Sequence, residues 1–171
     1  MDSGVDPDVR QEAKGSVGQR YSVRSERTAD GLRAHTQVRQ FTLETGAHRG
    51  DPDAGPNAVE TLLTAIGSCL LTGLGMVAEG SHIPLDAVAI DLEAERSDQP
   101  PRITSVTYAI HLDSSAPDER LARLVELSER NSTVLGSLRG CGFAVEGRWD
   151  RAGSRAGSST SPPHYDGADP A

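Results

Sequence analysis

The stretch GPNAVETLLTAIGSCLLTGLGMVAEG, residues 55–80, decides the fold because it encodes one long helix. Asn57 is the predicted N-cap, a position where a polar side chain satisfies free backbone N–H groups. Apolar residues then recur every three or four positions, the spacing of one helix face: Val59, Leu62, Leu63, Ile66, Cys69, Leu70, Leu74 and Val77. Ala65, Leu71 and Met76 lie off this stripe, so more than one face should be covered and the helix should be central.

Upstream of this helix, the pattern predicts extended structure. Polar and apolar residues alternate in residues 20–28, residues 29–31 (ADG) form a turn signal, and an extended pattern resumes from Leu32 to Leu43. This order is typical of a β-hairpin or short meander. Residues 44–56 hold three glycines and two prolines, which predicts a loop of a length that often serves a site.

Downstream, two alternating stretches, Asp86 to Glu95 and Val106 to Leu112, predict a pair of antiparallel strands. Ser115 is the expected cap of a second helix that ends near Asn131. A short apolar turn over 134–138 and a last strand over 143–149 follow. The predicted class is therefore α+β, with antiparallel sheets packed round a long central helix.

Composition limits the domain organisation, the location and the partners that we expect. We expect disorder over residues 1–18 and 150–171, which leaves one domain over residues 19–149. The net charge of −8 argues against nucleic acid as a partner. We find neither a signal peptide nor an apolar run of membrane-spanning length, so we expect a cytoplasmic protein without membrane contact. The cysteine and histidine spacings match no metal cage, and we expect neither a metal nor another cofactor.

Cys69 is the best candidate for chemistry, although a cysteine on an apolar helix is often a small packing residue. A reactive thiol needs a lowered pKa, and a nearby arginine is a usual cause. Cys69 lies too far into the helix for the dipole to supply this effect. Arg39 and Arg49 precede the helix closely enough to fold back towards it, so both are candidate activating residues, while each is also a plausible surface charge.

Three motifs in this order resemble the OsmC/Ohr family (osmotically inducible protein C and organic hydroperoxide resistance proteins). They are GPNA at 55–58, GSC at 67–69 and LDAV at 85–88, and the resemblance extends from about Thr36 to Trp149. It implies an interleaved homodimer whose helix cysteine, here Cys69, attacks the O–O bond of a hydroperoxide as a thiolate. It also implies an antioxidant role in stress response, with organic hydroperoxides preferred if the site is apolar.

The sequence departs from the family pattern in three places that bear on activity. The family's arginine on an early strand has no motif-level match here, which leaves the two candidate arginines to proximity alone. The family's second cysteine, which resolves the oxidised first one, is replaced here by Ser132, and Cys141 substitutes only if it lies within about 7 Å of Cys69, Cα to Cα. The family's carboxylate ten residues before the cysteine falls on Val59. Glu60 is the nearest acid, and it is either a site carboxylate or a solvated acid of the first turn.

Three functions remain open at this point. The first is a thiol peroxidase that uses Cys69 and an external thiol reductant, either a low-molecular-weight thiol or a lipoyl-type dithiol. The second is another reaction at Cys69, such as sulfur, persulfide or acyl handling in a biosynthetic pathway. The third is a non-catalytic dimer that binds a small apolar ligand and buries Cys69 as a packing residue.

Overall fold

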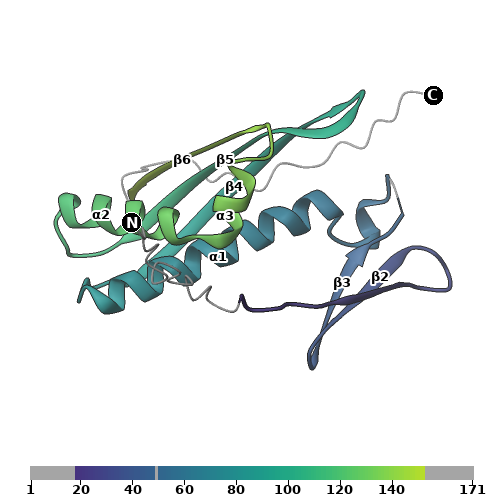
Figure 1. Ribbon diagram of the computed structural model, residues 1–171, viewed down its shortest axis with the longest axis horizontal. Coiled ribbons are helices and arrows are strands. Elements are labelled where there is room, and N and C mark those ends of the chain that lie inside the picture. The colour runs from purple at the N-terminus through teal and green to yellow at the C-terminus, as the bar shows by residue number, and fades with distance from the viewer. Residues whose placement is uncertain (1–17, 49, 153–171) are drawn as a thin grey trace, which may run out of the picture.

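The computed structural model describes residues 18–48 and 50–152, which form an α+β fold (Figure 1). Within these residues there are two three-stranded sheets, three α-helices and one short 3-10 helix. Their bounds are β1 (Arg24–Arg27), β2 (Arg33–Val38), β3 (Phe41–Gly46), η1 (Pro52–Ala54), α1 (Ala58–Gly80), β4 (Ala87–Asp98), β5 (Pro101–Asp113), α2 (Asp118–Asn131), α3 (Thr133–Leu138) and β6 (Ala144–Arg151). The predicted class and the long helix are confirmed.

The helix α1 begins at the predicted cap. The Asn57 side chain accepts hydrogen bonds from the backbone N–H groups of Val59 and Glu60, at 2.9 and 3.1 Å. The Glu60 carboxylate in turn accepts from the Asn57 N–H at 2.7 Å. This reciprocal capping box satisfies N–H groups that otherwise have no partner in the first turn, and it fixes where the helix starts.

The second sheet has the strand order β4-β5-β6, and helices pack on one of its faces. The strands β4 and β5 pair antiparallel, as predicted, and β6 joins β5 in parallel. The core between sheet and helices is formed by fully buried side chains from α1, β5, α2 and α3: Ile66, Leu70, Leu74, Val106, Ile110, Leu112, Leu121, Leu124, Ser128 and Leu135. The last strand continues to Arg151, two residues beyond the predicted domain boundary.

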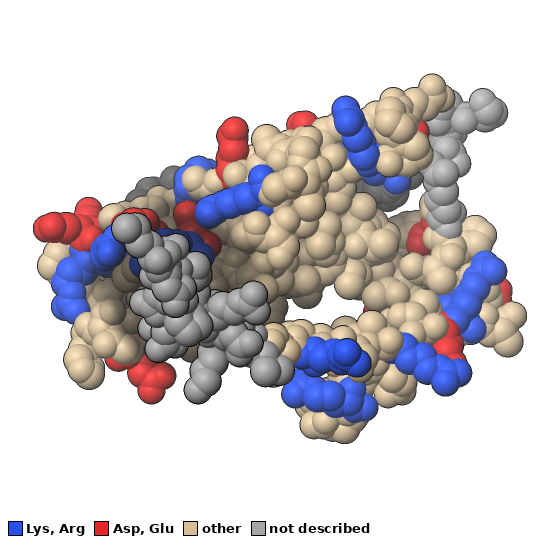
Figure 2. All heavy atoms as spheres, viewed as in Figure 1, with Lys and Arg blue, Asp and Glu red and all other residues tan. Residues whose placement is uncertain are grey.

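The first sheet, of order β1-β2-β3, lies apart from the second sheet near the N-terminal end of α1 (Figure 1). An opening separates it from the body of the molecule in Figure 2. Large apolar side chains of this segment are exposed to solvent, including Val23 (63%), Phe41 (54%) and Leu43 (52%). A sheet face of this kind lacks a core of its own within one copy of the chain.

The helix α1 also exposes apolar surface. By length and composition alone it is long and apolar enough to cross a membrane. Core helices of water-soluble proteins meet the same criterion. Only 28% of its apolar 18-residue window is buried, and Leu71 and Met76 are 44% and 69% exposed.

One local prediction is wrong. The helix α2 begins at Asp118 with Pro117 as its N-cap, and Ser115 does not cap it. The neighbouring Ser114 hydroxyl instead accepts from the Ala116 N–H at 3.1 Å, a local serine turn that delays the helix.

The predicted hairpin or short meander is present as the antiparallel strands β1, β2 and β3. A tight turn at Arg39, whose φ of 57° is left-handed, divides the extended stretch from Leu32 to Leu43 into two strands. The sequence gives no signal for this turn, because arginine is not a typical turn residue.

Candidate functional site

Cys69 lies in the middle of α1 and is half-buried. Its neighbours Ile66 and Leu70 are fully buried in the core. Cys69 is therefore at the edge of the buried stripe, partly shielded by the core. A thiol at such an edge is accessible to a small reactant, unlike a fully enclosed packing cysteine.

The Cys69 sulfur meets Ser132, which sits between α2 and α3. The Ser132 hydroxyl donates a hydrogen bond to the Cys69 Sγ at 3.1 Å. Ser132 is only 4% exposed, and its hydroxyl oxygen also accepts from the Leu135 N–H at 3.3 Å as the N-cap of α3. This capping contact orients the hydroxyl, so its proton points to the sulfur.

The close packing of α1 on α2 brings these two residues together. A Cβ added at Gly73 would lie 3.5 Å from the Ser128 backbone oxygen and 3.6 Å from its Cβ. Cys69 lies four positions before Gly73 on α1, and Ser132 lies four positions after Ser128. One helical turn along each helix therefore leads from the Gly73–Ser128 contact to the Cys69–Ser132 contact. Since the two paths run in opposite sequence directions, the helices cross antiparallel and the glycine sets their separation.

Ser132 occupies the position that the family resemblance assigns to the second, resolving cysteine. Its contact with Cys69 is what a pair of redox partners in those positions would require. From the sequence, Ser132 stands out only as the place of a missing thiol. The Ser-Thr pair that follows Asn131 is a helix-cap signal, and it could have located the hydroxyl at the start of α3 but not its distance from Cys69.

Glu60, the acidic candidate, caps the N-terminal end of α1. Its side chain is exposed and its carboxylate accepts the Asn57 N–H. Nine residues along the helix separate it from Cys69, a rise of about 13 Å. The structure thus assigns Glu60 a capping contact and does not bring it to the sulfur within this chain.

Of the two arginine candidates the structure describes Arg39, for which it records no contact with Cys69. Arg39 is exposed in the turn between β2 and β3, and its guanidinium carbon lies 5.8 Å from the centre of the Phe41 ring. Arg49 lies outside the described residues. Within those residues the recorded polar partner of the Cys69 sulfur is a neutral hydroxyl, so any cation must come from elsewhere.

Cys141 follows α3 and is exposed to solvent. Its thiol donates to the Ser137 carbonyl oxygen at 3.3 Å, and its backbone N–H donates to the Leu138 carbonyl at 2.9 Å. Both cysteines are free thiols. Cys141 is thus held against the end of α3, on a contact network separate from that of Cys69 and Ser132.

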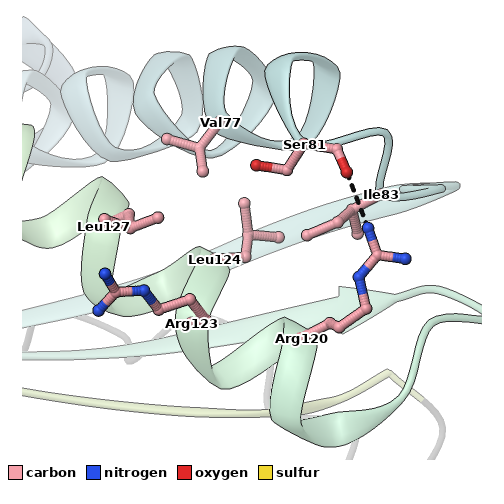
Figure 3. A pocket seen from close by; sticks show the side chains of 7 residues that line it. All are labelled: Val77, Ser81, Ile83, Arg120, Arg123, Leu124 and Leu127. Atoms are coloured by element: carbon pink, nitrogen blue, oxygen red, sulfur yellow. Dashed lines mark hydrogen bonds between the residues drawn. The ribbon is translucent and has the colours of Figure 1, made fainter.

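A small cavity of about 120 Å³ lies between the C-terminal end of α1 and α2, away from Cys69. In Figure 3 apolar side chains line it and the Arg120 side chain crosses it to the Ser81 carbonyl oxygen, at 2.7 Å. The lining residues are Val77, Ser81, Ile83, Arg120, Arg123, Leu124 and Leu127. Arg120 here neutralises the carbonyl end of α1, a structural role. Among the described residues no cluster of three potential metal ligands occurs.

Comparison with known proteins places the fold. The sequence model of the family described as "OsmC-like protein" matches residues 50–146, more than half of the chain. The search of curated protein sequences gave no match.

Solved structures resemble the chain over most of its length. An OsmC-like protein from Mycoplasma pneumoniae is 13% identical, with a TM-score of 0.71, over 78% of this chain and 97% of that chain. The organic hydroperoxide resistance protein OhrB of Bacillus subtilis is 16% identical, with a TM-score of 0.56, over 78% of this chain and 98% of that chain. An organic hydroperoxide resistance protein from Legionella pneumophila is 15% identical, with a TM-score of 0.58, over 77% and 96%. At these identities the likeness supports the fold.

Proposed function

The chain belongs to the OsmC-like protein family, and from that premise we propose that it is a thiol peroxidase that reduces hydroperoxides through Cys69. The observation that carries the proposal is the hydrogen bond from Ser132 to the Cys69 sulfur, 3.1 Å long. A hydroxyl that donates to the sulfur can hold and orient a thiolate there, because an anion accepts a strong hydrogen bond. The thiolate is the nucleophilic form of cysteine.

The reaction begins when the Cys69 thiolate attacks the distal oxygen of the hydroperoxide. The O–O bond breaks, the sulfur gains one oxygen as a sulfenic acid, and the alkoxide takes a proton to leave as an alcohol. The half-buried setting of Cys69 favours an organic hydroperoxide over hydrogen peroxide, because apolar surface can bind the organic group.

Reduction then requires a thiol from outside the chain. A serine hydroxyl in place of the resolving thiol cannot reduce a sulfenic acid to a disulfide, and the Cys141 thiol is engaged with Ser137 at the end of α3. An external thiol condenses with the sulfenic acid to a mixed disulfide and water. A second thiol equivalent then releases the Cys69 thiol and an external disulfide.

We further propose that the working form is a homodimer in which the N-terminal sheet of one copy packs on the body of the other. Exposed apolar side chains of the first sheet, of the residue before it and of α1 support the proposal, because a stable monomer rarely exposes many large apolar side chains: Phe41, Leu43, Val23, Leu71 and Met76. Such an interface would be the source of a cation near Cys69, which the described residues of one copy do not supply.

Charge supports the same arrangement. Residues 18–48 contain five arginines and three acidic residues, whereas residues 50–152 contain eight arginines and sixteen acidic residues. Figure 2 shows basic side chains gathered over the N-terminal sheet. The basic N-terminal sheet of one copy and the acidic body of the other are electrostatically complementary, which favours their association. A cytoplasmic location is part of the proposal, since cytosolic reductants keep thiols such as Cys69 reduced.

The experiment that tests the proposal measures consumption of an organic hydroperoxide with an excess of a monothiol or of a lipoyl-type dithiol. Wild-type and Cys141→Ser proteins should turn over at similar rates, and Cys69→Ser protein should consume no more hydroperoxide than the buffer with reductant. Equal rates for wild type and Cys69→Ser would exclude Cys69 as the peroxidatic residue.

A second candidate is a different reaction at Cys69, such as persulfide or acyl transfer. The observation in its favour is Ser132 itself, because a hydroxyl at the sulfur supports a thiolate without providing a resolving thiol. This alternative predicts a wild-type protein that is inert to hydroperoxides with every reductant, yet is rapidly alkylated at Cys69. A slow alkylation rate that rises only on unfolding would instead favour a non-catalytic binder of an apolar ligand.

A further inference from the structure

The carboxylate of Glu129 joins three elements of the fold. Glu129 belongs to α2, and its Oε1 accepts a hydrogen bond from the Tyr108 hydroxyl of β5 at 2.8 Å. Its Oε2 lies 3.6 Å from the Arg139 Nη2 at the C-terminal cap of α3. Glu129 therefore ties the sheet, the second helix and the third helix together at one point.

The Tyr108 side chain is closely packed. The Tyr108 ring lies over its parallel partner Gly147 on β6, where an added Cβ would come within 2.1 Å of the ring carbon Cζ. Tyr108 is only 5% exposed. Burial, and after it the Glu129 carboxylate, raises the pKa of the Tyr108 phenol, so the hydroxyl stays protonated and donates to Glu129 at neutral pH.

These contacts hold the chain in place on both sides of Ser132, in α2 before it and in α3 after it. The helix α2 ends where the Ser132 N–H donates to the Glu129 carbonyl oxygen at 3.3 Å, and α3 begins with Ser132 as its cap. The Glu129 side chain holds the last turn of α2 to the sheet and, through Arg139, the far end of α3 to α2. The place of the Ser132 hydroxyl, and with it the 3.1 Å contact to Cys69, follows from this arrangement.

We propose that Glu129, held between Tyr108 and Arg139, is a positioning residue that sets the reactivity of Cys69 by holding Ser132 against the sulfur. The inference deepens the proposed function, since it rests on Cys69 as a reactive thiol. It does not require a hydroperoxide substrate. Glu129 acts through the α2–α3 junction and makes no recorded contact with the sulfur in the described residues.

The test is the pH profile of Cys69 alkylation by iodoacetamide in a Cys141→Ser background, with the half-maximal pH as its readout. Ser132→Ala should move the half-maximal pH upward and slow alkylation at pH 7 on the order of threefold to tenfold, the loss expected for one ordinary hydrogen bond. Glu129→Gln and Tyr108→Phe should move it in the same direction. In a Ser132→Ala background neither should move it further, because the hydroxyl that they position is gone.

The direction of the shift separates positioning from other effects. Glu129→Gln removes a negative charge, so a direct electrostatic effect on the thiolate would move the half-maximal pH downward, opposite to the proposal. A merely structural role would lower the melting temperature and leave the half-maximal pH in place. The matched control is Glu126→Gln, which removes an exposed carboxylate of α2 paired with Arg123 at 2.5 Å and should leave the profile unchanged.

The proposal is overturned if both Glu129→Gln and Tyr108→Phe keep the wild-type half-maximal pH, or if their shifts add to that of Ser132→Ala. Because alkylation needs no hydroperoxide, these outcomes are independent of the peroxidase assay. A protein that passes this test and fails that assay retains the positioning role with a different reaction at Cys69.

Discussion

Ser132 donates its hydroxyl proton to the Cys69 sulfur across 3.1 Å, although 63 positions separate the two residues in the sequence. The contact joins the middle of α1 to the junction of α2 and α3. It places a polar donor at the one thiol that the family resemblance marks as reactive, at the position where relatives are expected to carry a second thiol. The site thus holds one thiol and one hydroxyl in direct contact.

The first prediction replaces this hydroxyl with a second thiol. In a Ser132→Cys, Cys141→Ser protein, the sulfur introduced at position 132 should form a disulfide with Cys69 after one equivalent of hydroperoxide, because the native atoms at these positions are already in contact. Intact mass should fall by two hydrogens, and peptide mapping should join the two segments. A stable pair of free thiols after oxidation would show that the junction cannot bring two sulfurs to bonding distance.

The second prediction concerns the packing of the Tyr108 ring on Gly147. Gly147→Ala should lower the free energy of unfolding by about 1–3 kcal/mol, because the added methyl group would overlap the buried ring. Urea unfolding measures the change at fixed protein concentration. Gly136→Ala is the control, since a Cβ there meets nothing within 4 Å. Equal stability of the two variants would contradict the packing of Tyr108 on Gly147.

The third prediction is a pH dependence with a defined sign. The pKa of Tyr108 is raised in the folded protein by burial and by Glu129, so above the unfolded value of about 10 the folded state binds more protons than the unfolded state. The stability from Tyr108 is therefore fully present below about pH 10 and is lost as the pH rises above it. Melting temperatures between pH 8 and pH 11 should fall more steeply for wild type than for Tyr108→Phe. Parallel curves would contradict the shift.

The fourth prediction tests the homodimer through α1. Met76→Glu places a charge on an apolar side chain that is 69% exposed in one copy, and it should shift the protein towards monomer at micromolar concentration. Sedimentation velocity measures the change. Ala122→Glu puts the same charge on the exposed face of α2 and should leave the dimer intact. A monomeric wild-type protein would contradict the dimer itself.

Capping and alternation patterns predicted the helices and strands that depend mainly on residues close together in the sequence. The start of α1 follows from Asn57 and Glu60, and the pair β4–β5 follows from alternation along each strand. The same patterns failed at Ser115, where a serine turn at Ser114 competes with the helix cap. They also missed the turn at Arg39, which lacks any turn residue.

The candidate site could be predicted only in part. Cys69 was identified through its motif, but its partner Ser132 lies at the end of another helix, and the distance between them depends on how closely α1 approaches α2 at Gly73. No sequence spacing encodes that approach. Glu60 could be read as a solvated acid of the first turn or as a site acid, and the structure places it in the capping box, which neither reading predicted.

The most direct test of the peroxidase proposal is capture of the sulfenic acid at Cys69. Cys141→Ser protein is treated with one equivalent of an organic hydroperoxide in the presence of a cyclic 1,3-dione, which traps sulfenic acids, and is then mapped by mass spectrometry. We predict a dione adduct on Cys69 that forms as the hydroperoxide is consumed and that fails to form when the protein is alkylated beforehand. An unmodified Cys69 thiol with the hydroperoxide still present would contradict the account.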